Sequence, residues 1–214
     1  MTHYPSPPCF AEGGVSRGNK MKYVCVFCGS SMGVQPAYKQ AAQALGEALT
    51  RRKLGLVYGG GNVGLMGTIA DATLAAGGEV IGVIPDFLVA QEIAHTGLTQ
   101  LHIVQSMHER KTMMAQLSDA FVALPGGYGT LEEFCEILTW AQLGLHQKPF
   151  ALFNVKGYYD PVLKFFDQAV TEEFLRPIHR SLVLEASEPE NLLDLLANYQ
   201  PKNVEKWITK EVKP

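Results

Sequence analysis

A glycine-rich turn followed by two carboxylates is the part of this sequence best suited to chemistry. The run Leu-Pro-Gly-Gly-Tyr-Gly-Thr-Leu-Glu-Glu occupies residues 124–133, after an apolar stretch at 120–123 and before a helical pattern at 131–143. Its glycines let backbone N–H groups approach a ligand, and the helix that follows directs the positive end of its dipole there. Such a turn binds anions, most often phosphate. Glu132 and Glu133 beside it predict chemistry on a phosphorylated substrate.

Glu133 has two interpretations from the residues alone. Thr130 and Glu133 fit a capping box, in which Thr130 caps a helix and Glu133 returns to the first N–H groups. Alternatively, Glu133 lines a cleft, because Glu133, Glu136 and Trp140 fall on one face of that helix. The opposite face is predicted to be apolar and carries Leu131, Phe134, Cys135 and Leu138. A polar stripe that begins at an anion-binding turn favours the cleft.

A second pair of charged residues, Arg110 and Lys111, lies near the start of another predicted helix. Ser106 and Glu109 form a capping box there, so both cations fall in the second helical turn. Cations near a helix N-terminus are unfavourable by roughly 0.3–1 kcal/mol, because they meet the positive end of the dipole. Two interpretations follow: the pair is solvated on the surface, or Arg110 faces the cleft and binds phosphate or pairs with Glu133.

Two further turns end predicted strands, Gly-Ser-Ser at 29–31 and Gly-Gly-Gly-Asn at 59–62. The carboxyl ends of parallel strands meet at one edge of a sheet, so we expect these turns and the 124–133 turn to form one pocket. The stretch 59–67 also resembles a dinucleotide fingerprint. That fingerprint belongs to the first βα turn and needs an acidic residue closing the next strand. Close packing against a smaller nucleotide is therefore the favoured interpretation.

Apolar runs alternate with helical patterns along nearly the whole chain. The expected strands are 22–28, 54–58, 80–84, 101–104, 121–124, 150–153 and 182–184. The expected helices are 36–52, 65–76, 106–117, 131–143, 159–174 and 190–199. This alternation predicts an α/β fold, a Rossmann-like doubly wound parallel sheet in a single domain. We expect the catalytic domain to span 21–200, with a disordered N-terminal extension at 1–20 and a C-terminal tail at 201–214.

The composition of the 214 residues, 47% of them hydrophobic, is that of an ordinary globular protein. The net charge of −3 argues against nucleic-acid binding. No apolar run approaches the ~20 residues that span a bilayer, and the first residues lack a secretory segment, so we expect a cytoplasmic protein without membrane contact.

Cys25 and Cys28 lie in a predicted strand and are expected to be buried structural thiols. The six histidines show no metal-ligand spacing, so no metal site is predicted.

The glycine-rich turn and the segment 107–111 together resemble the LONELY GUY family of cytokinin-activating enzymes. The family pattern Pro-Gly-Gly-x-Gly-Thr-x-x-Glu matches residues 125–133, and its Met-x-x-Arg-Lys matches 107–111. The resemblance extends from about Lys22 to Tyr199 and includes the Thr-Trp-Ala-Gln-Leu-Gly at 139–144. Relatives are often labelled lysine decarboxylases. The sequence contains no recognisable lysine context for pyridoxal phosphate.

The resemblance implies a phosphoribohydrolase, which cleaves the N-glycosidic bond of a nucleoside 5′-monophosphate to free base and ribose 5-phosphate. The base is an N6-substituted or a plain adenine, and the sequence leaves this choice open. By resemblance, Arg110 and Glu133 are the catalytic pair. The substrate-binding positions that it implies are Ser30, Gly60, Gly61, Glu92, Met107, Lys111, Gly126, Gly127, Tyr128, Gly129, Thr130, Leu131, Glu132 and Thr139. It also implies a homodimer, and no metal or redox cofactor is needed for such a reaction.

Two other functions stay open. A non-catalytic nucleotide or molybdenum-cofactor carrier on the same fold would use the anion-binding turn without needing Arg110 and Glu133 to face each other. A dinucleotide-dependent oxidoreductase would use the 59–67 turn instead.

Overall fold

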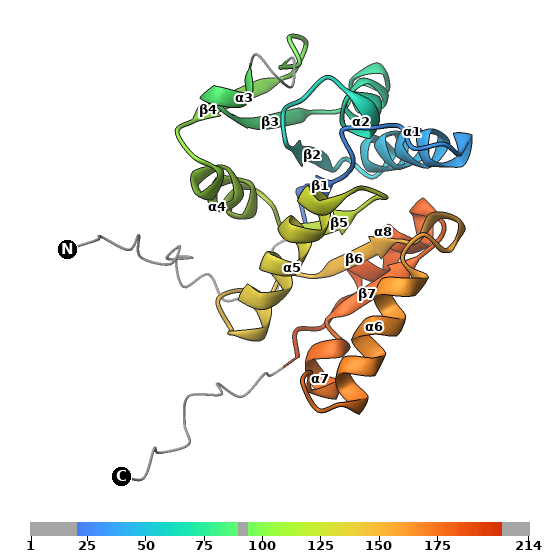
Figure 1. Cartoon of the computed structure of the whole chain (residues 1–214). Coiled ribbons are helices and arrows are strands. Elements are labelled where there is room, and N and C mark those ends of the chain that lie inside the picture. Colours follow the sequence, from blue (N-terminus) through green and yellow to red (C-terminus); the bar gives the residue numbers. More distant parts are fainter. Residues whose placement is uncertain (1–20, 90–93, 203–214) are drawn as a thin grey trace, which may run out of the picture.

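The computed structural model describes residues 21–89 and 94–202, so the predicted extension at 1–20 and most of the predicted tail lie outside it. One sheet contains seven strands in the order β4-β3-β2-β1-β5-β6-β7, which runs from top to bottom in Figure 1. All neighbouring strands are parallel. The strands are β1 (Tyr23–Phe27), β2 (Gly55–Tyr58), β3 (Val80–Pro85), β4 (Gln100–Val104), β5 (Ala120–Ala123), β6 (Phe150–Phe153) and β7 (Val183–Ala186). The predicted Rossmann-like parallel sheet is confirmed.

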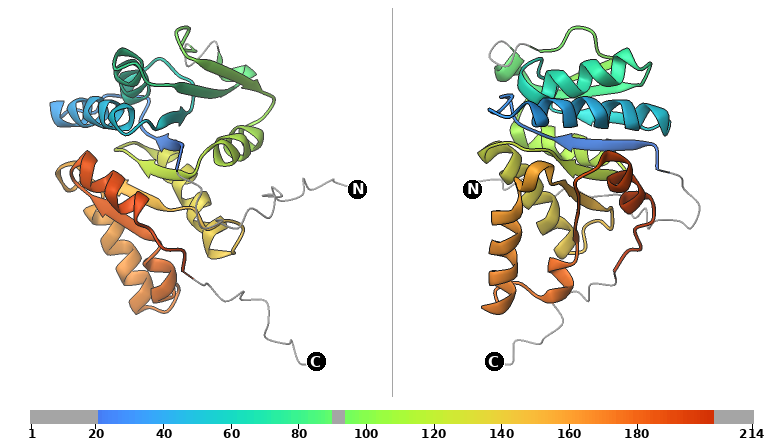
Figure 2. Two further views of the ribbon diagram at one scale, coloured as in Figure 1. Left: turned by 180° about the vertical axis from the view of Figure 1, so that it is seen from behind. Right: turned by 90° about the vertical axis from the view of Figure 1, so that its right-hand side faces the viewer.

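Helices cover both faces of the sheet and create two cores. Alternate residues of β1 enter different cores, Val24 and Val26 one of them, Cys25 and Phe27 the other. The first core is covered by α1 (Pro36–Arg51), α2 (Gly64–Ala75) and α8 (Pro189–Ala197). The second is covered by α4 (Met107–Leu117), α5 (Tyr128–Gln142) and α6 (Asp160–Thr171). Figure 2 shows α1 and α2 side by side in both of its views. Burial on both faces explains why the central strands are continuous apolar runs.

The longer elements agree with the prediction to within a few residues. Three short elements were not predicted from the sequence. They are α3 (Asp86–Val89), the 3₁₀-helix η1 (Val155–Gly157) and α7 (Pro177–Arg180). Each is shorter than the stretch of residues over which a helical period can be recognised. The connection between β3 and β4 therefore begins with a helical turn.

Helix α5 begins earlier than the sequence predicts. It starts at Tyr128 with Gly127 as its N-cap, and no side chain caps it. The capping box of Thr130 and Glu133 is therefore wrong. Thr130 is buried in the first turn, where its side chain packs against the Cα of Gly126.

The buried face of α5 also differs from the prediction. Phe134 and Ile137 face the core as apolar residues should, and Trp140 joins them with 7% of its surface exposed. Cys135, which was expected on the apolar face, is exposed. Glu133 and Glu136 are half-buried at the border of this face. The carboxylate stripe therefore runs along the edge of the core.

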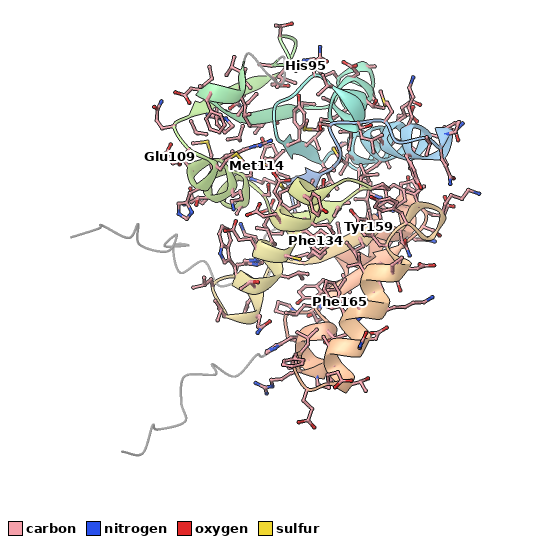
Figure 3. The ribbon with its side chains drawn as sticks, in the orientation of Figure 1. His95, Glu109, Met114, Phe134, Tyr159 and Phe165 are labelled. Atoms are coloured by element: carbon pink, nitrogen blue, oxygen red, sulfur yellow. The ribbon has the colours of Figure 1, made fainter. Side chains whose placement is uncertain are left out.

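The predicted N-cap of α4, Ser106, is confirmed. The Glu109 N–H donates to Ser106 Oγ at 3.1 Å, as expected for an N-cap. The Glu109 carboxylate accepts from the N–H of Gln105 at 2.8 Å, one residue before the expected partner. Figure 3 labels Glu109 at the outer end of this helix. Arg110 and Lys111 accordingly lie in the second turn.

The predicted burial of Cys25 and Cys28 is confirmed, and both are free thiols. Burial raises the pKa of each well above its usual value, so both remain protonated and unreactive. Among the described helices, none combines the length and apolar character that a bilayer crossing requires.

His146 gives the fold a predicted sensitivity to acid. Its Nε2 donates to the Ile137 carbonyl at 3.0 Å and its Nδ1 accepts from the Lys148 N–H at 3.2 Å, which fits the neutral ring. Burial lowers the pKa of His146 from 6.5 to about 4. The pKa of His146 is therefore lower in the folded than in the unfolded chain. The contribution of the neutral ring to folding stability is fully present above about pH 6.5 and is lost as the pH falls toward 4.

We expect the free energy of unfolding to fall by up to about 1.4 kcal/mol per pH unit across that window. Urea titrations at a series of pH values measure this slope. His146→Gln removes the titrating ring and should flatten the dependence. An unchanged slope in the variant would assign the acid sensitivity to another group.

Candidate active site

The strand order places the candidate site where β1 and β5 lie side by side. From β1 the chain proceeds through β2 and β3 to one edge, and from β5 through β6 to the other. In open parallel sheets, ligands bind at such a switch point, outside the carboxyl ends of the strands. The turns after β1 and β5 meet there, because the Gly29 N–H donates to the Pro125 carbonyl at 3.1 Å. The Leu65 N–H at the start of α2 donates to the Gly29 carbonyl at 3.0 Å and brings in the third turn.

Gly126 occupies the point of closest packing between these turns. A Cβ at Gly126 would overlap the Thr130 side chain and lie 2.9 Å from the Gly29 nitrogen, so glycine is required. Gly127 and Gly129 differ, since a Cβ at either would meet no atom within 4 Å. The turn is therefore closed toward β1 and open on its outer side.

The open side of this turn carries backbone donors. The first N–H of α5 to bond back toward the turn is that of Leu131, which donates to the Gly127 carbonyl at 3.1 Å. Within residues 21–89 and 94–202, the N–H groups of 127–130 have no acceptor. The α5 dipole adds partial positive charge at the same place. We call residues 126–130 the donor turn; its geometry suits a phosphate group.

Arg110 points into the protein, so the interpretation of it as a solvated surface residue is wrong. It is 5% exposed, and its Nη2 donates to the Gly59 carbonyl at 3.1 Å. Its Nη1 lies 3.8 Å from Met107 Sδ. A Cβ on Gly59 would overlap the guanidinium, so the missing side chain provides the space that Arg110 fills. The cation is thereby held at the carboxyl end of β2.

The charges of Glu133 and Arg110 both affect the pKa of the same buried thiol. Burial raises the pKa of Cys28, the residue after β1, and the negative charge of Glu133 raises it further, whereas Arg110 lowers it. The pKa of Cys25 responds to both charges in the same directions. By geometry, the guanidinium from α4 is bonded at the end of β2, the neighbour of β1, and Glu133 lies on α5 five residues after Tyr128 of the turn that follows β5.

Lys111 joins α4 to α5 through two carboxylates. Its Nζ lies 2.5 Å from Glu132 Oε1 and 2.9 Å from Glu136 Oε2. Burial opposes the charge of Lys111, but the hydrogen bonds and charges of both glutamates raise its pKa overall. Two helices that follow different strands are thus fixed to each other next to the site.

Other predicted binding positions lie around this centre. Ser30 is exposed on the turn after β1. Gly60 and Gly61 are buried and contact residues that precede β4. The Gly60 carbonyl accepts from the His95 N–H at 3.0 Å, and Gly61 pairs with Ala94 in an isolated antiparallel bridge.

Two predicted positions are not brought to the donor turn. Thr139 follows Thr130 by nine residues, about 14 Å along the helix axis at 1.5 Å per residue. Its hydroxyl donates to the Cys135 carbonyl at 2.7 Å. Glu92 lies outside the described residues. Tyr128, by contrast, is on the donor turn and is 93% exposed.

A groove of about 630 Å³ runs along α1 and α2 and reaches Asn62 and Gly64 of the turn after β2. Its charged lining residues are Lys39, Glu47 and Asp71. It includes neither the donor turn nor a side chain from α4 or α5, so its size does not make it the candidate site.

Comparisons with known proteins bear on the family. A family model described as "Possible lysine decarboxylase" matches residues 66–196. The probable cytokinin riboside 5′-monophosphate phosphoribohydrolase LOGL9 of Oryza sativa subsp. japonica is 52% identical over 190 residues, 89% of this chain and 83% of that protein. The cytokinin riboside 5′-monophosphate phosphoribohydrolase LOG7 of Arabidopsis thaliana is 48% identical over 184 residues, 86% of this chain and 85% of that protein.

Among solved structures, the molybdenum-cofactor carrier protein of Chlamydomonas reinhardtii has a TM-score of 0.62 at 21% identity, covering 82% of this chain and 94% of that one. A likeness at that identity concerns the fold alone. The relatives that are about half identical over most of both chains are decisive: this chain belongs to the LONELY GUY family of cytokinin riboside 5′-monophosphate phosphoribohydrolases.

Proposed function

We propose that this protein hydrolyses the N-glycosidic bond of a nucleoside 5′-monophosphate, releasing the free base and ribose 5-phosphate. The observation that carries the proposal is the row of backbone donors at 127–130 beside the charges of Glu133 and Arg110. The names of the relatives support the same reaction on a cytokinin riboside monophosphate. AMP is the corresponding substrate with a plain adenine.

The donor turn would hold the 5′-phosphate. Backbone N–H groups and the α5 dipole favour a dianion there without bringing in a competing negative side chain. Glu133 lies five residues after Tyr128, about 7.5 Å along the axis. That spacing is comparable with the length of ribose 5-phosphate, so the carboxylate would reach the anomeric carbon.

Glu133 would then act where the bond breaks. N-glycosidic hydrolysis passes through an oxocarbenium-like transition state, in which positive charge develops on the ribose ring. A carboxylate beside the anomeric carbon stabilises that charge and orients or deprotonates the attacking water.

Arg110 would support this carboxylate and the substrate. A positive charge near Glu133 favours its ionised form, which the reaction needs. The same guanidinium can hydrogen-bond ribose and phosphate oxygens. Lys111 would keep Glu132 and Glu136 directed toward α4, as their ion pairs with it indicate.

The carrier function has weaker support. A carrier needs the donor turn, but it does not need a buried arginine and a carboxylate beside that turn. The likeness to carrier structures is at 21% identity, against about half of all residues for the hydrolases.

We also propose a homodimer in the cytoplasm. The dimer follows from the family resemblance, and Thr139, exposed about 14 Å along α5 from its own donor turn, is then placed for contact with a partner. The buried free thiols Cys25 and Cys28 suit a reducing compartment. Sedimentation equilibrium that returned the monomer mass of 23.4 kDa would contradict the dimer.

A substrate panel tests the reaction. The purified chain is incubated with AMP, with an N6-isopentenyl AMP and with the two matching nucleosides, and free base and ribose 5-phosphate are quantified. We expect equal amounts of both products from the monophosphates. The nucleosides should have a kcat/KM lower by about a hundredfold or more, since charge-assisted hydrogen bonds contribute about 1.5–3 kcal/mol each. Release of no base from any compound, or equal rates without phosphate, would reject the proposal.

A further inference from the structure

A tyrosine from a distant part of the chain holds one carbonyl of the donor turn. Tyr158 follows η1, and its hydroxyl donates to the Gly126 carbonyl at 2.6 Å. The neighbouring Tyr159 donates to the Leu124 carbonyl, also at 2.6 Å, from a fully buried position. Two consecutive tyrosines thus bind the carbonyls on either side of Pro125.

The peptide between Gly126 and Gly127 is the one whose orientation matters. In a planar trans peptide, the C=O and the N–H that follows it point in opposite directions. The bond from Tyr158 to the Gly126 carbonyl therefore directs the Gly127 N–H away from the tyrosine. That N–H is the first of the donors without an acceptor in the described part of the chain.

The two residues on either side of this peptide do little by themselves to fix its orientation. Both residues that flank the peptide are glycines, so side chains do not restrict its rotation, and the space beside Gly127 is open. A rotated peptide would present the Gly126 carbonyl to the bound anion. The interaction would change from attractive to repulsive.

From this geometry we infer that Tyr158 is a positioning residue for the donor turn: its hydroxyl fixes the Gly126–Gly127 peptide with the N–H directed at the 5′-phosphate. The inference rests on the proposed function. The ring of Tyr158 is suited to the task, because edge-on contacts with Tyr38 at 5.7 Å and Tyr159 at 5.1 Å hold it in place. Tyr159, labelled in Figure 3 near Phe134, belongs to the core and contacts that ring edge-on at 6.0 Å.

Tyr158→Phe tests the inference because it removes the hydroxyl and leaves the ring. Tyr38→Phe is the matched control, since it removes a hydroxyl from the ring that packs against Tyr158. The measurements are KM and kcat for AMP, the inhibition constant of ribose 5-phosphate, and the melting temperature. We expect KM and the inhibition constant to rise together by about three- to tenfold in Tyr158→Phe, with a smaller change in kcat. The kinetic and inhibition constants of Tyr38→Phe should stay near the wild-type values, and so should the melting temperatures of both variants.

Binding of inorganic phosphate, followed by calorimetry, separates this inference from the reaction. If neither the wild-type protein nor a variant releases base, but phosphate binds more weakly to Tyr158→Phe than to Tyr38→Phe, the proposed reaction is wrong and the role of Tyr158 stands. Equal KM and equal phosphate affinity in the two variants would overturn the inference. So would a wild-type protein that binds neither phosphate nor ribose 5-phosphate.

Discussion

Replacing Glu133 with glutamine should reduce the rate of base release by about 10²–10³-fold. A preorganised charge directed at the site of developing charge is worth that much in kcat in other enzymes. Glutamine keeps the shape of the side chain but can neither stabilise an oxocarbenium ion by charge nor accept a proton from water. Phosphate binding at the donor turn uses backbone groups, so the affinity for ribose 5-phosphate should stay within a few-fold of wild type.

Single-turnover release of adenine from AMP measures the effect. Glu47→Gln provides the matched control, because Glu47 is an exposed carboxylate on α1, 3.8 Å from Arg51. It should leave the rate unchanged. A Glu133→Gln enzyme that releases base at near the wild-type rate would show that the carboxylate has no part in bond cleavage.

Adding one methyl group at Gly59 should be almost as damaging as removing Arg110. The new Cβ would occupy the position of the guanidinium, which bonds to the carbonyl of the same glycine. Arg110 would then have to leave its buried place, and the charge beside Glu133 would shift. We expect a loss of about ten- to a hundredfold in kcat, and a loss of stability of about 1–3 kcal/mol from overpacking.

A double-mutant cycle identifies the cause. If Gly59→Ala acts by displacing the guanidinium, it should cost little further activity or stability once Arg110→Ala has emptied the space. Steady-state kinetics and urea denaturation of the four proteins give both coupling energies. Additive effects would mean that Gly59 acts on the backbone of the turn and not through Arg110.

The fold could be predicted from the sequence because each of its signals is local. Continuous apolar strands, helical periods and glycine turns determine a parallel α/β sheet, and the turn at its carboxyl edge follows from that topology. The position of Arg110 in the second turn of α4 is also local, since it depends on the cap at Ser106.

What the sequence could not predict depends on contacts between distant segments. Thr130 fits a capping pattern, but close packing with Gly126 buries it and lets the helix begin earlier. The three consecutive glycines after β2 look alike in sequence, and only the approach of α4 singles out Gly59. Tyr158 lies 32 residues beyond the carbonyl that it holds, so no spacing rule connects them.

The pairing of β1 with β5 also governs when activity can first appear in a newly made chain. Val24 pairs with Ala120, a partner made 96 residues later, so this join must close a long loop that the pairing of β1 with β2 does not. Arg110 arrives on one side of that join and Glu133 on the other. A chain that stops after β4 can have four strands in register and still lack any place for a nucleotide. Turnover is therefore a direct report that β5 has paired with β1.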